Sequence, residues 1–381
     1  MKICAIICEY NPFHNGHLYQ LNQAKKQSGA DAVLCLMSGN FVQRGEAAIL
    51  HKNIRAQHAI KAGADVVLEL PTVFATSNAE LFAKGAIHIL SSIPNVTTLC
   101  FGAESADKTA FYLAARYLNN EPKEVSDAIK REVGKGTSYA KARAQAFAGF
   151  IPFDLLNSPN NILGMEYTKA IQATNANIDI LPIQRQGANY NDTALHEEYA
   201  SASAIRQAII RQESARNYLP DFVANDLPKE LESKLGVLEK YAILSTPKQE
   251  IASVCDCTEG LENAFVKAAT CEGPFETSLC SPRYTASRIR RIALQNLLKI
   301  DETLIRSSLQ SPLYLRVLAA NTSRKDVLSS LAQSKFPLIV RSGDTNALSS
   351  TANECYERDL FADKVYSLLY PSSEKDKSIF Q

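Results

Sequence analysis

The sequence lacks any long hydrophobic run. No apolar stretch approaches the ~20 residues that a membrane-spanning helix requires. Glu9 also interrupts the first apolar run before it reaches the ~7 to 15 residues of a signal-peptide core. We therefore expect a cytosolic protein without a membrane partner. With 381 residues, 46% of them hydrophobic and 21% charged, the chain can bury a large core and is expected to form two domains.

Cysteine pairs of the kind that hold disulfides or structural zinc are also scarce. The nine cysteines are an odd number, and several stand singly in apolar segments, as Cys4, Cys35 and Cys100 do. This pattern is typical of buried reduced thiols. Cys255 and Cys257 form a CxC pair, whereas structural zinc sites usually combine two CxxC pairs. We favour neither a disulfide framework nor a metal site, and leave open whether the CxC pair binds anything.

A strong net charge is absent too, because the formal charge is only +1. The charge is unevenly distributed, however. Residues 281–325 hold nine basic residues against two acidic ones, so the rest of the chain must be slightly acidic. This one region therefore suits an anionic partner.

What the sequence does contain is a regular alternation of short apolar runs and helical patterns. The apolar runs are residues 3–8, 32–37, 65–70, 97–101 and 178–183. A helical pattern follows each of the first four runs, near residues 17–27, 52–62, 78–91 and 106–117. Runs that are apolar throughout indicate parallel strands covered on both faces. We predict an α/β fold with a doubly wound parallel sheet in residues 1–220, followed by a mostly α-helical domain in residues 221–381.

The stretch EYNPFHNGHLYQ, residues 9–20, joins the first predicted strand to its helix and places His14 and His17 three positions apart. Ligands of open parallel sheets bind at the carboxyl ends of the strands, and a helix N-terminus at that edge favours phosphate. The histidines can donate to phosphate oxygens, and Gly16 permits a close approach. The alternatives are a surface histidine with a helix cap, or a metal pair without an obvious third ligand. The position of the two histidines between a strand and a helix favours phosphate binding over these alternatives.

The segment from His14 to His17 resembles the HIGH signature of the nucleotidyltransferases and class I aminoacyl-tRNA synthetases, whose histidines contact ATP phosphates during adenylyl transfer. A second signature of these enzymes, at a later helix N-terminus, holds the leaving phosphates. Residues 201–206, SASAIR, fit it and follow the strand 178–183. Alone, Ser201 could simply cap a helix. The resemblance implies that Ser201, Ser203 and Arg206 grip the departing pyrophosphate.

Further segments are similar to the bacterial tRNA(Met) cytidine acetate ligase family over the whole chain. They are EYNPFHNGH, SGNFVQRGE (38–46), FGAES (101–105), SPNNILGMEY (158–167) and RYTASRIRRIALQNLL (283–298). The resemblance implies a HIGH-type, Rossmann-like nucleotidyltransferase domain that activates acetate with ATP as acetyl-adenylate. The acetyl group would then pass to N4 of the wobble cytidine in elongator tRNA(Met). Mg²⁺ is expected on the ATP phosphates, no residue is assigned as a metal ligand, and no DNA partner is expected.

By position, the family's ATP site would comprise the first loop, Gly102, Asn160 or Asn161, and Arg185. The loop residues are Ile7, Cys8, Glu9, Tyr10, Asn11, Pro12, Phe13, His14, Asn15, Gly16, His17, Leu18, Tyr19 and Gln20. His14 and His17 are the expected catalytic residues. Each of the other positions also has an ordinary structural explanation, such as a turn glycine, a Pro-Asn turn or a solvated strand end. The choice between the two asparagines stays open, and the base for the cytidine amine is not identified.

The basic region also supplies candidate RNA contacts. They are Arg283, Arg288, Arg290 and Arg291. Arg288 and Arg291 are spaced i, i+3, while apolar residues such as Ile289 and Ile292 form the opposing face of the predicted helix. A packed helix with a basic stripe can bind an RNA backbone, although helical arginines are usually just solvated surface.

Two other functions share part of this pattern. One is a nucleotidyltransferase that adenylylates a phosphorylated cofactor precursor, which would not need a basic helical domain. The other is a non-catalytic RNA-binding protein with a degenerate nucleotide fold, against which the intact HxGH and SxSxIR segments argue. The acid that is activated, the identity of the tRNA and the oligomeric state leave no motif in the sequence.

Overall fold

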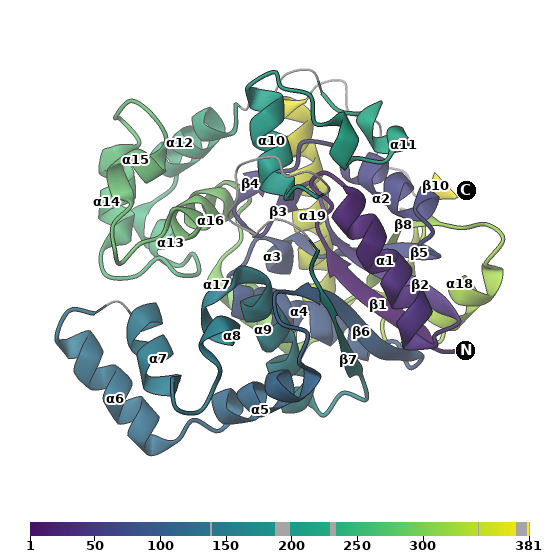
Figure 1. Ribbon diagram of the computed structural model, residues 1–381. Helices are drawn as coiled ribbons and strands as arrows, with labels where there is room; N and C mark the ends of the chain where they lie inside the picture. Colours follow the sequence, from purple (N-terminus) through teal and green to yellow (C-terminus); the bar gives the residue numbers. More distant parts are fainter. Residues whose placement is uncertain (138, 187–198, 229–233, 342, 371–378, 381) are drawn as a thin grey trace.

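The computed structural model shows a central, mostly parallel sheet with helices on both faces (Figure 1). It describes residues 1–381 except 138, 187–198, 229–233, 342, 371–378 and 381. The strands follow the order β10-β8-β5-β2-β1-β6-β7, and β9 pairs with β8. They are β1 (Ile3–Cys8), β2 (Ala32–Ser38), β5 (Val66–Leu70), β6 (Val96–Ala103), β7 (Asp179–Gln184), β8 (Leu315–Ala320), β9 (Leu338–Ile339) and β10 (Ile379–Phe380). A separate hairpin joins β3 (Phe41–Val42) and β4 (Glu46–Ala47). The five predicted strands are therefore confirmed, to within one or two residues.

The strands are apolar throughout because each lies between two helix layers. In β1, Ile3 and Ala5 pack into one core, whereas Cys4 and Ile6 pack into the other. The helices of the first part are α1 (Asn15–Ser28), α2 (Lys52–Lys61), α3 (Thr72–Ala75), α4 (Ala79–Ser91), α5 (Lys108–Asn119), α6 (Lys123–Gly134), α7 (Tyr139–Phe147), α8 (Phe153–Asn157), α9 (Pro159–Thr174), α10 (Ala202–Ile210), η1 (Arg216–Tyr218) and α11 (Asp221–Ala224). Helices α1, α2 and α10 cover one face of the sheet, and α4 and α9 cover the other.

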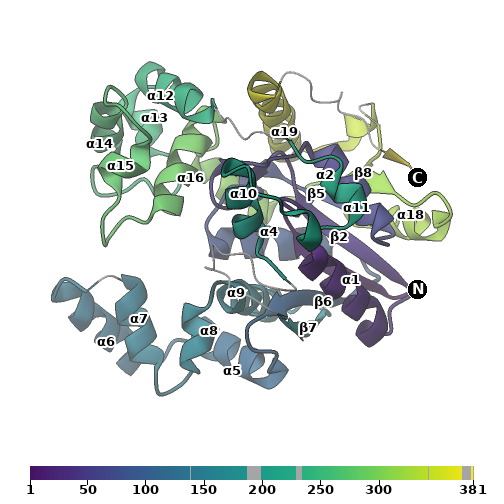
Figure 2. The same ribbon diagram turned by 45° about the horizontal axis from the view of Figure 1, so that its top comes forward.

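The last part of the chain is mostly helical, as predicted. Its helices are α12 (Leu235–Ser245), α13 (Lys248–Ala252), α14 (Leu261–Ala268), α15 (Phe275–Leu279), α16 (Ala286–Leu297), α17 (Glu302–Gln310), α18 (Lys325–Leu331), η2 (Asp344–Ala347) and α19 (Ser350–Leu369). Residues of α12–α16 build a small core of their own around Phe265 and Ile292. Both views place α12–α16 and α6–α8 toward the carboxyl ends of the parallel strands (Figures 1 and 2).

One strand within residues 221–381 was not predicted from the sequence and joins the central sheet. Strand β8 joins the central sheet and runs antiparallel to β5. Helices α17 and α19 pack on the main core beside it. The chain thus returns to the first domain after α16, and a boundary near residue 220 stays a prediction. Among the described helices, none is long and apolar enough to cross a membrane.

Candidate active site

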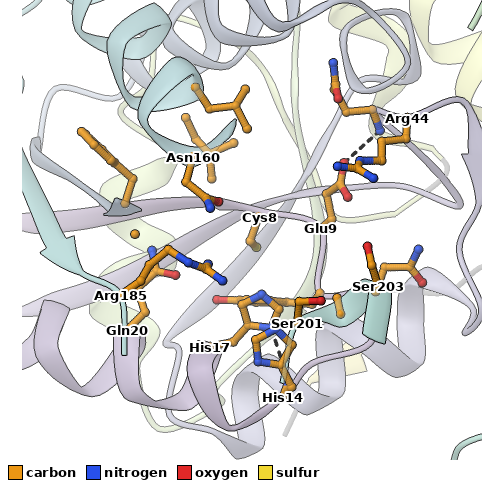
Figure 3. Close-up of a pocket in the computed structure, with 18 of the residues that line it drawn as sticks. Cys8, Glu9, His14, His17, Gln20, Arg44, Asn160, Arg185, Ser201 and Ser203 are labelled. Atoms are coloured by element: carbon orange, nitrogen blue, oxygen red, sulfur yellow. Dashed lines mark hydrogen bonds between the residues drawn. The ribbon is translucent and has the colours of Figure 1, made fainter. Parts of the chain in front are cut away.

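A deep pocket lies at the carboxyl ends of β1 and β6, where the N-termini of α1 and α10 meet (Figure 3). It encloses about 1100 Å³ of space that includes open solvent. Most of the predicted site residues line it: Ile7, Cys8, Glu9, Tyr10, Asn11, His14, His17, Gln20, Gly102, Asn160, Arg185, Ser201, Ser203 and Arg206. The structure therefore brings together two segments that are almost 190 residues apart in the sequence.

The remaining residues of the predicted loop are not in this lining. Gly16 and Tyr19 line a smaller adjoining pocket, which shares His14, His17 and Arg185 with the first. Phe13 is fully buried in the core. Pro12, Asn15 and Leu18 line neither of these two pockets.

The two histidines are fixed by the start of α1. His14 is the N-cap of this helix, and its Nδ1 accepts the Gly16 N–H at 3.1 Å. His17 Nδ1 accepts the His14 N–H at 3.3 Å, and the two rings stack with centroids 3.7 Å apart. Because each Nδ1 acts as an acceptor, each neutral ring carries its proton on Nε2. The helix-cap alternative is thus correct for His14, but the same ring also lines the pocket.

The environment keeps both imidazoles uncharged. Burial lowers the pKa of His14 to about 3, and the positive charges of Arg185 and Arg206 act in the same direction. Burial also lowers the pKa of His17 well below its usual value, with smaller contributions from His14 and Arg185. At neutral pH the pair therefore offers Nε2–H donors without adding charge to the site.

The position of the His14 ring requires a glycine at residue 16. A Cβ at this position would lie 2.9 Å from His14 Cε1 and 3.1 Å from its Nδ1, closer than real Cβ atoms normally approach. The glycine of the HxGH segment thus makes room for the capping ring.

We expect Gly16→Ala to push the His14 ring from its position and to lower the rate of adenylate formation about 10- to 100-fold, since small misplacements at a reacting centre are costly. Acetate-dependent exchange of pyrophosphate into ATP measures this rate. Gly134→Ala is the matched control, because no heavy atom lies within 4 Å of a Cβ built at Gly134. Equal rates for the two variants would contradict this role of Gly16.

The second signature lies at the N-terminus of α10. Ser201 caps this helix, and its Oγ accepts the Ala204 N–H at 3.0 Å. The Arg206 guanidinium donates to the Asn11 carbonyl at 2.8 Å and lies 3.3 Å from Ser203 Oγ. The cap explanation for Ser201 is therefore correct as well. Arg206 connects this helix directly to the first loop, so the two signatures form one wall of the pocket.

The structure separates the roles of the two candidate asparagines. Asn161 is fully buried, and its side chain accepts the backbone N–H groups of Glu104 and Ser105 while donating to Asp154. Asn160 lines the pocket, and its side chain donates to Glu104 Oε1 at 2.6 Å. Of the two, only Asn160 can meet a ligand in this pocket.

Several lining residues have no role in the sequence-based site. Gln43 and Arg44 come from the loop between β3 and β4, Phe101 comes from β6, Ala202 is the first residue of α10, and the others come from α4 and α9. The latter are Phe82, Leu163 and Tyr167. Gln43 and Tyr167 fall in segments that resemble the family, SGNFVQRGE and SPNNILGMEY. The resemblance of these segments to the family could have indicated Gln43 and Tyr167 as site residues. It does not, however, say which side chains face the pocket.

The predicted basic stripe on α16 is mostly occupied by contacts within the protein. Arg291 is only 9% exposed and lies 3.7 Å from Asp256. Arg290 pairs with Glu46 and Glu276, and Arg288 donates to the Asp256 carbonyl. Only Arg283 is largely exposed among the four candidates.

The basic helix is also docked on a loop of the pocket. Arg290 donates to the Arg44 carbonyl at 3.1 Å. Gly45 has a φ of +75°, and a Cβ there would lie 2.6 Å from the backbone of Arg290. Glu46 lies 3.6 Å from Arg206 on one side and 3.3 Å from Arg290 on the other. Helix α16 is therefore held directly beside the pocket.

Comparisons with known proteins agree with this geometry. The family model "HIGH Nucleotidyl Transferase" matches residues 1–379. The tRNA(Met) cytidine acetate ligase of Caldanaerobacter subterraneus subsp. tengcongensis is 38% identical over 97% of this chain and 96% of its own, and that of Thermoanaerobacter sp. is 39% identical over 98% and 96%.

Solved structures agree as well. The crystal structure of Thermotoga maritima TmcAL in an apo form has a TM-score of 0.92 and 31% identity, covering 100% of this chain and 99% of that one. A second crystal structure, of the same protein bound with alpha-thio ATP, has a TM-score of 0.89 and 30% identity at the same coverage. The chain therefore belongs to the HIGH nucleotidyltransferases and, within them, to the tRNA(Met) cytidine acetate ligase family.

Proposed function

We propose that this protein activates acetate with ATP to form acetyl-adenylate and pyrophosphate, and then acetylates N4 of the wobble cytidine in elongator tRNA(Met). We also propose that the reaction takes place in the cytosol, where tRNA is used. The observation that carries the proposal is the pocket in which two neutral histidine donors and the start of α10 face the same space. The names of the relatives and the alpha-thio ATP bound to a similar structure support it.

In the first step, an acetate oxygen attacks the α-phosphorus of ATP and pyrophosphate leaves. A carboxylate is already a competent nucleophile, so positioning and charge stabilisation supply most of the rate. The Nε2–H groups of His14 and His17 donate to phosphate oxygens as negative charge develops there. Ser203 and Arg206, together with the free N–H groups at the start of α10, hold the leaving pyrophosphate.

The adenosine part of ATP is assigned to the side of the pocket where Gly102 and Arg185 lie. Both residues line the main pocket and the adjoining one. A Cβ at Gly102 would come no closer than 3.6 Å to any protein atom, so the glycine leaves space for a ligand rather than relieving a clash. Asn160 can bond the nucleotide from the opposite wall (Figure 3).

Mg²⁺ would reach the site on the phosphates of ATP. In the part of the chain that the structure describes, no group of three His, Cys, Asp or Glu side chains could hold a metal ion. Nucleotide-bound Mg²⁺ commonly keeps several waters and needs few protein ligands, so this site is compatible with it. The ion would neutralise phosphate charge, and we assign no residue of this chain as its ligand.

One assay separates this function from the two alternatives. The protein is incubated with ATP, radiolabelled acetate and total tRNA, and both pyrophosphate and acid-stable label on tRNA are measured. We expect acetate-dependent pyrophosphate release and labelled tRNA. Pyrophosphate release without acetate dependence would instead support an adenylyltransferase acting on a cofactor precursor, and the absence of ATP turnover would support a non-catalytic RNA-binding protein.

The tRNA contacts are tested at the exposed edge of the basic region. Arg283 is 69% exposed, and Arg288 is half-buried beside it. We expect the double variant Arg283→Gln and Arg288→Gln to weaken tRNA binding about 10-fold at moderate salt, and to reduce the slope of log affinity against log salt by about 0.7 for each lost phosphate contact. Filter binding across a salt series measures both quantities.

The control for this pair is Arg306→Gln. Arg306 is also a strongly exposed arginine of the basic region, and it pairs with Glu302 on its own helix α17. If the double variant and the control bound tRNA equally well, the assignment of this surface would be wrong. Arg291 is unsuitable for such a test, because it is only 9% exposed and its removal would disturb the packing of α16 against Asp256.

A further inference from the structure

The pocket has two ends on either side of the paired histidines. One end contains Gln20, Gly102 and Arg185 and continues into the adjoining pocket, which is where the proposed function places adenosine. The other end contains Glu9 and Arg44 and is closed by aromatic residues of α4 and α9. The reacting phosphate would lie between the two ends, so an acceptor must approach from the second one.

Two contacts show that Glu9 and the aromatic wall belong to the same end. Glu9 Oε1 accepts the Gln43 N–H at 2.9 Å, and the Gln43 side chain donates to the Ser77 carbonyl at 3.2 Å. Ser77 lies two residues before α4, which carries Phe82 into the pocket. The rings of Phe82 and Tyr167 are 6.5 Å apart and form an apolar wall suited to a flat base.

We propose that Glu9 is the catalytic residue that binds the N4 amine of the target cytidine and accepts its proton during acetyl transfer. This inference rests on the proposed function and adds the base for its second step. Among the described residues that line the pocket, Glu9 is the only carboxylate. Its Oε2 has no hydrogen-bond partner in the described part of the chain, and Figure 3 shows the side chain turned toward the pocket, across from His14 and His17.

The other candidate bases are excluded by their surroundings. The Nδ1 atoms of His14 and His17 already accept backbone N–H groups, so the nitrogens left for the ligand carry protons and can only donate. Burial raises the pKa of the Cys8 thiol and of the Tyr10 hydroxyl well above their usual values. Neither group therefore supplies an anion at neutral pH.

The chemistry of the cytidine amine requires such an acceptor. Its lone pair is delocalised into the ring, which makes N4 a weak nucleophile. A carboxylate is also the side chain that recognises a cytosine N4–H. N4 attacks the carbonyl carbon of acetyl-adenylate, a C–N bond forms, the bond between that carbon and the AMP oxygen breaks, and the N4 proton passes to Glu9. Glu9 later releases this proton to solvent, and AMP leaves with the bridging oxygen, which came from acetate.

The surroundings of Glu9 suit a base that must be regenerated near neutral pH. Burial raises the pKa of this carboxyl, and Glu46 acts in the same direction. The bond from the Gln43 N–H and the charges of Arg206 and Arg55 oppose this rise. A carboxylate with a raised pKa is a more effective proton acceptor than an ordinary surface glutamate.

The decisive variant is Glu9→Gln, because its amide oxygen can still accept the Gln43 N–H but cannot take up a proton. Enzyme-bound acetyl-adenylate is formed with ATP, labelled acetate and pyrophosphatase, and transfer to tRNA is then followed in a single turnover. We expect Glu9→Gln to slow transfer at least about 100-fold, while acetate-dependent ATP–pyrophosphate exchange falls by no more than about fivefold.

The pH profile gives a second readout. The wild-type transfer rate should rise with pH as Glu9 loses its proton, Glu9→Asp should keep this rise at a lower rate, and Glu9→Gln should lose it. Glu80→Gln is the control, since Glu80 is a surface carboxylate of α4 that is 48% exposed. It should change neither rate.

Three outcomes have distinct meanings. Transfer by Glu9→Gln at the wild-type rate would overturn the assignment of the base. An equal loss of exchange and transfer would also overturn it, and would instead place Glu9 at the phosphates or their metal. A wild-type protein without acetate-dependent exchange would refute the proposed function itself, independently of Glu9.

Discussion

His14→Asn is expected to lower acetate-dependent ATP–pyrophosphate exchange by about 100- to 1000-fold, the usual cost of removing one donor from a charge-stabilising site. The substitution keeps the fold, because asparagine is among the best N-cap residues and its side-chain oxygen can accept the Gly16 N–H in place of His14 Nδ1. It removes the Nε2–H donor that faces the pocket. Binding of tRNA should stay nearly unchanged, because the α16 surface is not altered.

The matched control is His51→Asn. His51 is also the N-cap of a helix, α2, through its Nδ1, and like His14 it is 5% exposed. It is not among the residues that line the pocket. His51→Asn makes the same substitution at a second helix cap. The rate of ATP–pyrophosphate exchange should therefore stay close to that of the wild type. Normal turnover by His14→Asn, or an equal loss in both variants, would refute the phosphate role of His14.

Lys52→Met is expected to lower the free energy of unfolding by about 3–5 kcal/mol, the typical cost of leaving buried charges without their partner. Lys52 is fully buried, and its ammonium group lies 3.0 Å from Glu69 and 2.5 Å from Asp363. These contacts connect α2 to β5 and to α19. Arg316 on β8 also pairs with Glu69, at 2.9 Å, and will moderate the loss. Urea unfolding followed by circular dichroism measures the change.

Lys84→Met provides the comparison for this variant. Lys84 pairs with Glu80 at 2.8 Å, but both side chains are more than 40% exposed. Solvent-exposed pairs of this kind usually contribute less than about 1 kcal/mol. If both variants unfolded at the same urea concentration, the buried network would not be what joins the C-terminal segment to the sheet.

The parts of the fold that rest on local pattern were predictable from the sequence. Strands buried on both faces must be apolar throughout, and a helix start beside a strand end must expose N–H groups. The five strands and the position of the HxGH segment followed from these two facts. Strand β8 was missed because its run, residues 315–320, stands alone among helical patterns. Its pairing with β5 is a contact between residues almost 250 positions apart.

Some residues of the site were likewise predictable from the sequence, whereas others could be identified only from the structure. The sequence names His14, His17 and Ser201 because their spacing is local and resembles a known signature. It does not choose between Asn160 and Asn161, which are adjacent on α9 and differ only in the direction of their side chains. Nor does the i, i+3 spacing of Arg288 and Arg291 reveal that the second is buried against Asp256.

The sequence alone determines the class of fold, the type of nucleotide chemistry and the family of this protein, because these depend on periodicity and on short motifs. Only the tertiary structure decides that the histidines are neutral donors. Their pKa values depend on burial and on two arginines that fold against them, Arg185 directly after β7 and Arg206 on α10. The same holds for Glu9. The resemblance places it in the first loop of the ATP site, but only the packed molecule makes it the carboxylate of the pocket, opposite the histidine pair.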